Sequence, residues 1–140
     1  MVMGERSPGI LDFQDAVYGP VTYDLVSLVR DCYFKFPDAA ISRYVNRFRE
    51  MLIENNRMTM VDETQFRRWF DLMGLQRHIK CAGIFSRLNI RDGKPGYLAD
   101  IPLVIRYLNE ACEPYPELQS FKAWLSEVVT PRLQMEAFKR

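Results

Sequence analysis

Two carboxylates near the start of the chain, Asp12 and Asp15, have the residue type and spacing that a metal site could use. They lie in the sequence ILDFQDAVYGP, where a short apolar run ends just before a Gly-Pro turn. Magnesium prefers carboxylate and phosphate oxygens, and a carboxylate at the end of a short strand has little freedom to lose on binding. An aspartate at such a point is also commonly a turn or capping residue. The pattern alone leaves both interpretations open.

Few other residues of the chain suggest catalysis. The single histidine, His78, lies mid-helix in LQRHIK, where a surface or core role is more common than catalysis. The stretch GKPG at 93–96 lacks the spacing and the preceding strand of a phosphate loop, so it indicates a turn. The sequence contains no HExxH, GxxxxGK[ST] or GxGxxG motif. The opening carboxylates are therefore the main chemical signal.

The composition indicates one ordinary globular domain over residues 1–140, with a formal net charge of +1. That charge gives no reason to expect nucleic acid as a partner. No apolar run approaches the roughly 18 residues of a membrane span, so no membrane partner is expected. The three cysteines, Cys32, Cys81 and Cys112, are odd in number and far apart, and they offer no CxxC metal pair. They suit free thiols in a reducing cytoplasm.

Around these carboxylates the sequence predicts a mainly α fold. Residues 1–13 alternate apolar and turn-rich stretches, which is typical of a short β-hairpin. From Asp24 onward apolar residues recur at helical spacing, and Asp62 precedes one such run as a candidate N-cap. Thr130 followed by proline suggests the N-cap of a short last helix. The expected helices cover 24–32, 41–52, 63–73, 75–88, 101–112, 118–128 and a few residues after 130. We thus expect a hairpin and metal-binding segment over 1–23 and a helical subdomain over 24–140.

The longer string LDFQDAVYGPVTYDLVSLVRDCY resembles the aminoglycoside phosphotransferase-like kinase family. In that family a metal-binding aspartate opens a motif of the form ID-x-x-D-A, followed by Gly-Pro and then by Tyr-Asp-Leu at a helix start. The downstream string GLQRHIKCAGIFSRLNIRDGKPGYLADIP is similar to the branch of anomeric sugar kinases that phosphorylate N-acetylmuramate and N-acetylglucosamine in cell-wall recycling. The resemblance extends from about Val2 to Leu133.

The resemblance implies the helical C-terminal subdomain of a protein-kinase-like fold. It also implies phosphoryl transfer from ATP to a sugar hydroxyl, with Mg²⁺ and ATP as cofactors and a small sugar as substrate. Asp12 would bind the metal, Asp15 would support it, and Asp24 would cap its helix and help hold the catalytic loop. One departure from the protein-kinase form is that Gln14, rather than glycine, follows Phe13.

The same resemblance implies parts that this sequence does not contain. Such kinases use a nucleotide lobe and a His-x-Asp catalytic loop, and no His-x-Asp occurs in the chain. In the family layout that loop lies just before the hairpin. We therefore expect the chain to be the carboxy-terminal part of a kinase, inactive alone and able to self-associate through apolar surface left exposed. The alternative is a non-catalytic helical scaffold or partner-binding module.

The acceptor pocket is expected on the apolar helix 75–88. Its polar residues Gln76, Arg77, His78 and Lys80 cannot all share one face of a helix. We expect Arg77, with Asp31 nearby, to face the acceptor, because a guanidinium makes directional hydrogen bonds to a sugar carboxylate or carbonyl. Simple salt bridging is the alternative. Trp69 and Phe70 could stack on a sugar, although aromatic residues at helical spacing are more often core.

Overall fold

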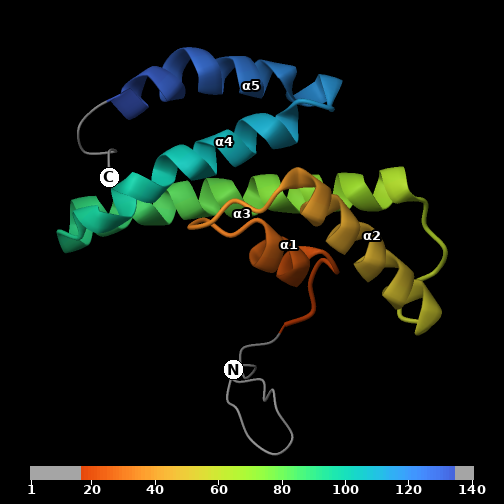
Figure 1. Cartoon of the computed structure of the whole chain (residues 1–140). Coiled ribbons are helices and arrows are strands. Elements are labelled where there is room, and N and C mark those ends of the chain that lie inside the picture. Colours follow the sequence, from red (N-terminus) through yellow and green to blue (C-terminus); the bar gives the residue numbers. More distant parts are fainter. Residues whose placement is uncertain (1–16, 135–140) are drawn as a thin grey trace, which may run out of the picture.

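A computed structural model describes residues 17–134, and these form helices and connecting segments without a β-strand (Figure 1). This confirms the mainly α prediction. The expected hairpin, Asp12 and Asp15 fall in 1–16, outside the described residues. The α-helices are α1 (Tyr23–Val29), α2 (Asp38–Glu54), α3 (Glu63–Asp92), α4 (Ile101–Cys112) and α5 (Gln119–Trp124). Shorter helical turns are η1 (Pro95–Asp100), η2 (Pro116–Leu118), η3 (Leu125–Val129) and η4 (Thr130–Gln134).

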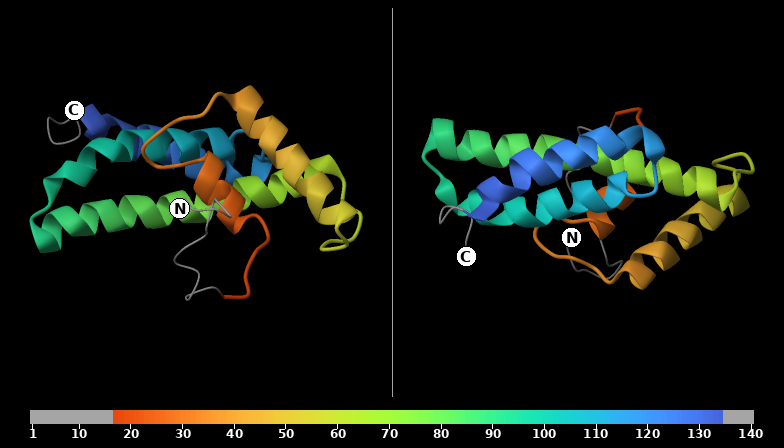
Figure 2. Two further views of the ribbon diagram at one scale, coloured as in Figure 1. Left: turned by 60° about the horizontal axis from the view of Figure 1, so that its bottom comes forward. Right: turned by 90° about the horizontal axis from the view of Figure 1, so that it is seen from above.

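Helix α3 is the central element, with 30 residues. It contacts α1, α2, η1 and α4, whereas α5 packs on α4. In Figure 1, α1 lies on one side of α3, and α4 and α5 lie on the other. Figure 2 shows from above how α4 runs alongside α3 with α5 over it. The two halves of the chain therefore meet along α3.

Two apolar clusters pack against α3, one along each half of it. The first joins α1, α2 and the start of α3, and it contains Leu25, Val26, Val29, Ile41, Val45, Phe66 and Phe70. The second joins the later part of α3 to η1, α4 and η3, and it contains Cys32, Phe85, Leu98, Ile101, Val104, Ile105, Leu108 and Leu125. The apolar stripes read from the sequence at 41–52 and 101–112 supply these clusters, as expected for amphipathic helices.

The ends of α3 follow from local chemistry. The Asp62 side chain accepts a hydrogen bond of 2.8 Å from the backbone N–H of Gln65, which confirms the predicted N-cap. Gly93 ends the helix with φ of 63°, a left-handed conformation that glycine adopts without steric cost. Between these ends the chain is one continuous helix. The sequence predicted two helices, 63–73 and 75–88, and this division is wrong.

Three local expectations also need correction. Helix α1 ends at Val29, so Cys32 lies in the connection to α2 rather than within the helix. Thr22 occupies the N-cap position of α1, and Asp24 lies in the first helical turn, so Asp24 is not the cap. Thr130 continues a helical run, and its hydroxyl donates to the carbonyl of Leu125 at 3.0 Å instead of capping a new helix.

Within residues 17–134, no helix is both long enough and apolar enough to cross a lipid bilayer.

Candidate functional site

A buried ion pair joins the end of α1 to α3. Arg30 Nη2 lies 2.7 Å from Asp71 Oδ1, and both side chains are almost fully buried. The guanidinium also lies over the Phe70 ring, 4.6 Å from its centroid. Burial lowers the pKa of Arg30, and the Asp71 carboxylate opposes that effect. Arginine nevertheless stays charged at any ordinary pH, so the pair is a true buried salt bridge.

Asp71 is shared with two further groups. Arg67 approaches Asp71 from one turn earlier in α3, with 3.1 Å between Nε and Oδ2. The hydroxyl of Tyr115, from the connection after α4, donates to the same oxygen at 2.9 Å. Burial and the carboxylate raise the pKa of Tyr115 to about 12, so its proton stays in place. Asp71 therefore holds α1, α3 and the segment after α4 together.

His78 is the next buried polar residue along α3. Its Nε2 lies 3.0 Å from the carbonyl oxygen of Arg30, and its ring stacks on Tyr107 with centroids 4.7 Å apart. The Tyr107 hydroxyl donates in turn to the carbonyl of Phe34 at 3.2 Å. Burial is the main cause that lowers the pKa of His78 to about 4, so the imidazole is neutral near pH 7. These contacts give His78 a structural role.

One face of α3 lies against the segment that follows the sequence motif ILDFQDA. Trp69, Met73 and Arg77 recur every four residues, so they share this face. The Trp69 carbonyl accepts a hydrogen bond of 3.4 Å from the Thr22 hydroxyl, and the Arg77 guanidinium lies 5.8 Å from the centre of the Tyr23 ring. The motif GPVTYDL is thereby anchored on α3.

A hollow of about 480 Å³ opens on this face. Its lining residues are Pro20, Val21, Thr22, Trp69, Leu72 and Met73. Trp69 is 39% exposed here, whereas Phe70 is fully buried. The general expectation that both aromatics belong to the core thus holds for Phe70 and fails in part for Trp69, whose ring meets Phe66 edge-on but stays partly exposed.

The polar residues of the predicted acceptor helix point in different directions, as expected. Gln76 and Lys80 are exposed, His78 is buried, and Arg77 is half-buried. The Nε of Arg77 is shielded from solvent and has no hydrogen-bond partner among the described residues. Within residues 17–134, Arg77 also makes no ion pair.

Asp31 lies in the connection between α1 and α2. It is half-buried, and its carboxylate accepts a hydrogen bond of 3.2 Å from the backbone N–H of Tyr33. Asp31 and Arg77 both act electrostatically on the thiols of Cys32 and Cys81. The two residues expected at the acceptor site therefore both lie within electrostatic range of the same two thiols.

The other expected site residues have simpler positions. Asp24 is exposed in the first turn of α1, where its charge interacts favourably with the helix dipole. Asp12 and Asp15 lie outside the described residues. Within 17–134, no group of three His, Cys, Asp or Glu side chains could hold a metal ion. The metal prediction therefore depends on residues 1–16.

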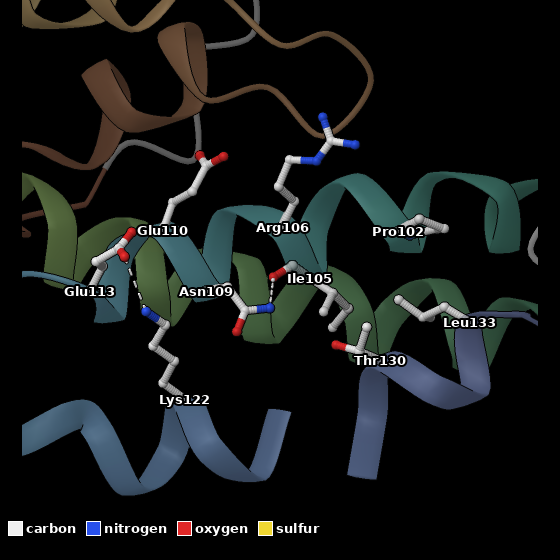
Figure 3. Close-up of a pocket in the computed structure, with 9 residues that line it drawn as sticks. All are labelled: Pro102, Ile105, Arg106, Asn109, Glu110, Glu113, Lys122, Thr130 and Leu133. Atoms are coloured by element: carbon white, nitrogen blue, oxygen red, sulfur yellow. Dashed lines mark hydrogen bonds and ion pairs between the residues drawn. The ribbon is translucent and has the colours of Figure 1, made fainter. Parts of the chain in front are cut away.

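A different hollow lies between α4 and the helical turns at the end of the described chain (Figure 3). It has a volume of about 300 Å³ and is lined in part by Arg106, Glu110 and Thr130. Lys122 reaches across it to Glu113, with 3.3 Å between Nζ and Oε1. Of the predicted site residues within 17–134, none borders this hollow, so it does not coincide with the expected acceptor site.

The sequence analysis missed Arg30, Asp71 and the pairing of Cys32 with Cys81. Each of these contacts joins residues more than 40 positions apart, which no helical periodicity reveals. The only sequence signal was a charged residue in an otherwise apolar stretch, as at Asp71 between Phe70 and Leu72.

Sequence comparisons with known proteins find phosphotransferases, as the two motif blocks indicated. Residues 1–60 match the phosphotransferase enzyme family. The chain is 44% identical over 129 residues to the N-acetylmuramate/N-acetylglucosamine kinase of Neisseria meningitidis serogroup B, an alignment that covers 92% of this chain and 39% of that relative. The enzyme of the same name from Pseudomonas putida is 41% identical over 128 residues, which are 91% of this chain and 38% of the relative.

A third relative, the N-acetylmuramate/N-acetylglucosamine kinase of Pseudomonas aeruginosa, is 42% identical over 118 residues, which are 84% of this chain and 35% of that protein. The chain thus spans less than two-fifths of the length of these relatives. No solved structure matches it. The resemblance inferred from the two motif blocks is confirmed.

Proposed function

We propose that this chain, which resembles amino-sugar kinases of the phosphotransferase enzyme family, is the part of an ATP-dependent sugar kinase that carries the metal-binding aspartate and acceptor-pocket helices. The observation that supports this most strongly is the 44% identity to an N-acetylmuramate/N-acetylglucosamine kinase over 92% of the chain. The complete enzyme would transfer a phosphoryl group to a hydroxyl of an N-acetylated sugar in the cytoplasm.

On this proposal Asp12 is the metal ligand, and Asp15 supports it. Mg²⁺, when bound with ATP, would neutralise charge on the nucleotide phosphates. Asp24 would help to hold the catalytic loop from the first turn of α1. The Thr22 and Tyr23 contacts with α3 support this arrangement, because they fix the end of the segment that carries both aspartates.

The acceptor would bind on the face of α3 that bears Arg77. The half-buried guanidinium makes no ion pair within residues 17–134, so a sugar carboxylate or carbonyl could pair with it. Asp31 would accept hydrogen bonds from sugar hydroxyls. Trp69 offers a partly exposed ring beside a hollow of about 480 Å³, a suitable surface for the apolar face of a sugar.

The experiment that tests the proposal is Asp12→Asn in the complete protein that contains this chain. We expect kcat to fall by at least about a hundredfold, with little change in KM for the sugar, because the lost interaction is with charge developing on the transferred phosphoryl group. Asp38→Asn, an exposed aspartate at the start of α2, is the matched control. A near-normal kcat for Asp12→Asn would refute the assignment of the metal ligand.

The coding sequence upstream of Met1 gives a second test. An in-frame His-x-Asp-x-x-x-x-Asn close to Met1 would supply the catalytic loop and support the kinase. The 140-residue chain alone should transfer no labelled phosphate from ATP to N-acetylglucosamine, since it contains no His-x-Asp. Turnover by the purified chain above a heat-treated control would refute this part of the proposal.

A scaffold or partner-binding role is the second candidate, and one surface feature favours it. An apolar hollow of about 380 Å³ lies between α1 and α2. Leu28 beside it is 70% exposed. This surface could meet the rest of a larger enzyme, another copy of the chain or a separate partner. An inactive complete protein with a stable oligomer in sedimentation analysis would favour the second candidate.

A further inference from the structure

Cys32 and Cys81 meet at the junction between the α1–α2 connection and α3. Cys81 packs against the apolar cluster that contains Cys32, and the two thiols are close enough for each to shift the pKa of the other. They are 49 positions apart in sequence, so the fold alone brings them together. Both are free thiols, as is Cys112.

The two thiols differ in their access to solvent. Cys32 is only 3% exposed, whereas Cys81 is partly exposed on α3. An external reagent therefore reaches Cys81 before it reaches Cys32. Cys112 is fully buried in α4, and burial raises the pKa of its thiol. Cys112 can therefore serve as the unreactive control cysteine within the same chain.

The charges around the pair favour a thiolate on Cys81. The hydrogen bond from Cys32 is the largest cause that lowers the pKa of Cys81, to about 6, and burial opposes it. The positive charges of Arg77 and Lys80 lower it further, and the Asp31 carboxylate raises it. The pKa of Cys32 is raised, mainly because its proton is held in the same hydrogen bond. A thiolate is the nucleophilic form of cysteine.

We propose that Cys81 and Cys32 form a thiol–disulfide exchange site that reacts with low-molecular-weight disulfides. The Cys81 thiolate attacks one sulfur of the small disulfide, forms a mixed disulfide and releases one small thiolate, which takes up a proton. Cys32 then loses its proton and attacks the Cys81 sulfur, which releases the second small thiol. Two protein thiols are oxidised to one disulfide, and one small disulfide is reduced to two thiols.

A disulfide between Cys32 and Cys81 would also affect the two residues expected to bind the acceptor, Asp31 and Arg77. Asp31 precedes Cys32 directly, and Arg77 lies one helical turn before Cys81 on α3. A Cys32–Cys81 disulfide would tie these two residues into one covalent unit and restrict their movement. This step alone rests on the proposed acceptor role of Asp31 and Arg77. The exchange reaction itself is independent of any kinase activity.

The test uses the 140-residue chain, wild type and as Cys32→Ser, Cys81→Ser and Cys112→Ser. Circular dichroism first checks that each variant is helical. Each protein is then incubated with oxidised glutathione at pH 7, quenched with acid, and mapped by peptide mass spectrometry. We expect a Cys32–Cys81 disulfide in the wild type and in Cys112→Ser. Cys32→Ser should accumulate a stable glutathione adduct on Cys81, and Cys81→Ser should form neither product.

Alkylation rates give a second measurement that does not depend on the variants. In the native wild-type chain, Cys81 should react with iodoacetamide at least about tenfold faster than Cys112, and in urea the two should react alike. Equal rates in native buffer, or a wild-type chain that keeps glutathione on Cys81 without closing the disulfide, would overturn the proposal. Failure of the kinase assay would leave both measurements unaffected, so the two proposals are tested separately.

Discussion

The imidazole of His78 contacts the backbone carbonyl of Arg30 through Nε2, at 3.0 Å, and so fixes the C-cap residue of α1. The same Arg30 extends its side chain to Asp71, about two turns earlier than His78 on α3. A backbone contact and a side-chain contact therefore hold the end of α1 at two points along one helix. The stability of the fold should depend on both contacts, and each can be changed separately.

Acid should weaken the fold through His78. Its pKa is about 4 when folded and 6.5 in an unperturbed chain, so between these values the unfolded state binds a proton that the folded state does not. The stability contribution is fully present above about pH 6.5 and is lost as the pH falls toward 4. Between pH 7 and pH 5 we expect a loss of about 2 kcal/mol from this residue.

The measurement is urea unfolding of the wild type and of His78→Gln at pH 7 and pH 5. Glutamine can keep the hydrogen bond to the Arg30 carbonyl but does not titrate, so the variant should lose less stability over this range. An equal pH dependence in both proteins would show that the imidazole is not the titrating group.

Removing the charge of Asp71 should be far more costly than removing an exposed one. Asp71→Asn leaves the Arg30 guanidinium buried without its counter-charge, and we expect a loss of about 3 kcal/mol in unfolding free energy. The control is Glu54→Gln, which breaks an exposed pair with Arg47 and should cost less than about 1 kcal/mol. Chemical denaturation that finds similar losses for both variants would contradict the role assigned to the buried pair.

Replacing each of two glycines of α3 with alanine should change the stability of the fold in opposite directions. A Cβ at Gly83 meets nothing within 4 Å, so Gly83→Ala should stabilise the helix by up to about 1 kcal/mol. A Cβ at Gly74 would lie 3.1 Å from Arg30 Nη1, which the ion pair with Asp71 holds in place. Gly74→Ala should therefore lower the melting temperature, while Gly83→Ala raises it. A higher melting temperature for both would show that Arg30 can move aside.

Arg77→Ala in the complete protein should raise KM for the sugar by about tenfold or more, because one directional hydrogen-bonding group is lost. The KM for ATP should change little. Arg87→Ala, which removes an exposed arginine farther along α3, is the matched control and should leave both constants unchanged. Steady-state kinetics with an unchanged sugar KM for Arg77→Ala would remove this residue from the proposed acceptor site.

The reactivity of Cys81 should depend on Cys32 in a way that pH reveals. In the wild type, the rate of alkylation at Cys81 should rise with pH through a midpoint below that of an ordinary cysteine, because the contact with Cys32 lowers the pKa of Cys81. Cys32→Ala removes the hydrogen bond and should move the midpoint upward, whereas Cys32→Ser keeps a donor and should move it less. Arg77, Lys80 and Asp31 remain in place in both variants. Identical midpoints in all three proteins would exclude the thiol contact as the cause.

Local patterns predicted the helices well. The apolar stripe at 41–52 and the N-cap at Asp62 both depend on residues within one or two turns, so the sequence contains the necessary information. The sequence analysis divided α3 at Gly74, and it did not reveal that the polar residues on either side, Asp71 and His78, are buried. Their partners come from α1 and α4, and only the folded chain supplies these partners.

The site residues also divide into those that local sequence spacing reveals and those that depend on contacts in the folded chain. The motif around Asp12 and Asp24 was recognisable because its spacing is local. The packing of Thr22 and Tyr23 against α3, and the contact of Cys32 with Cys81, depend on how α1 and its connection lie on that helix. No pattern within a single segment contains that information.

The buried polar residues between the two apolar clusters also determine how the helices align. Apolar side chains tolerate a shift of one helix along another, since one contact between methyl groups replaces a similar one. If α1 moved by one turn along α3, Arg30 would lose Asp71 and its carbonyl would lose His78, leaving charged and polar groups buried without partners. Misaligned but compact forms of the chain are therefore disfavoured, so Arg30, Asp71 and His78 select one register from the several that the apolar surfaces alone would accept.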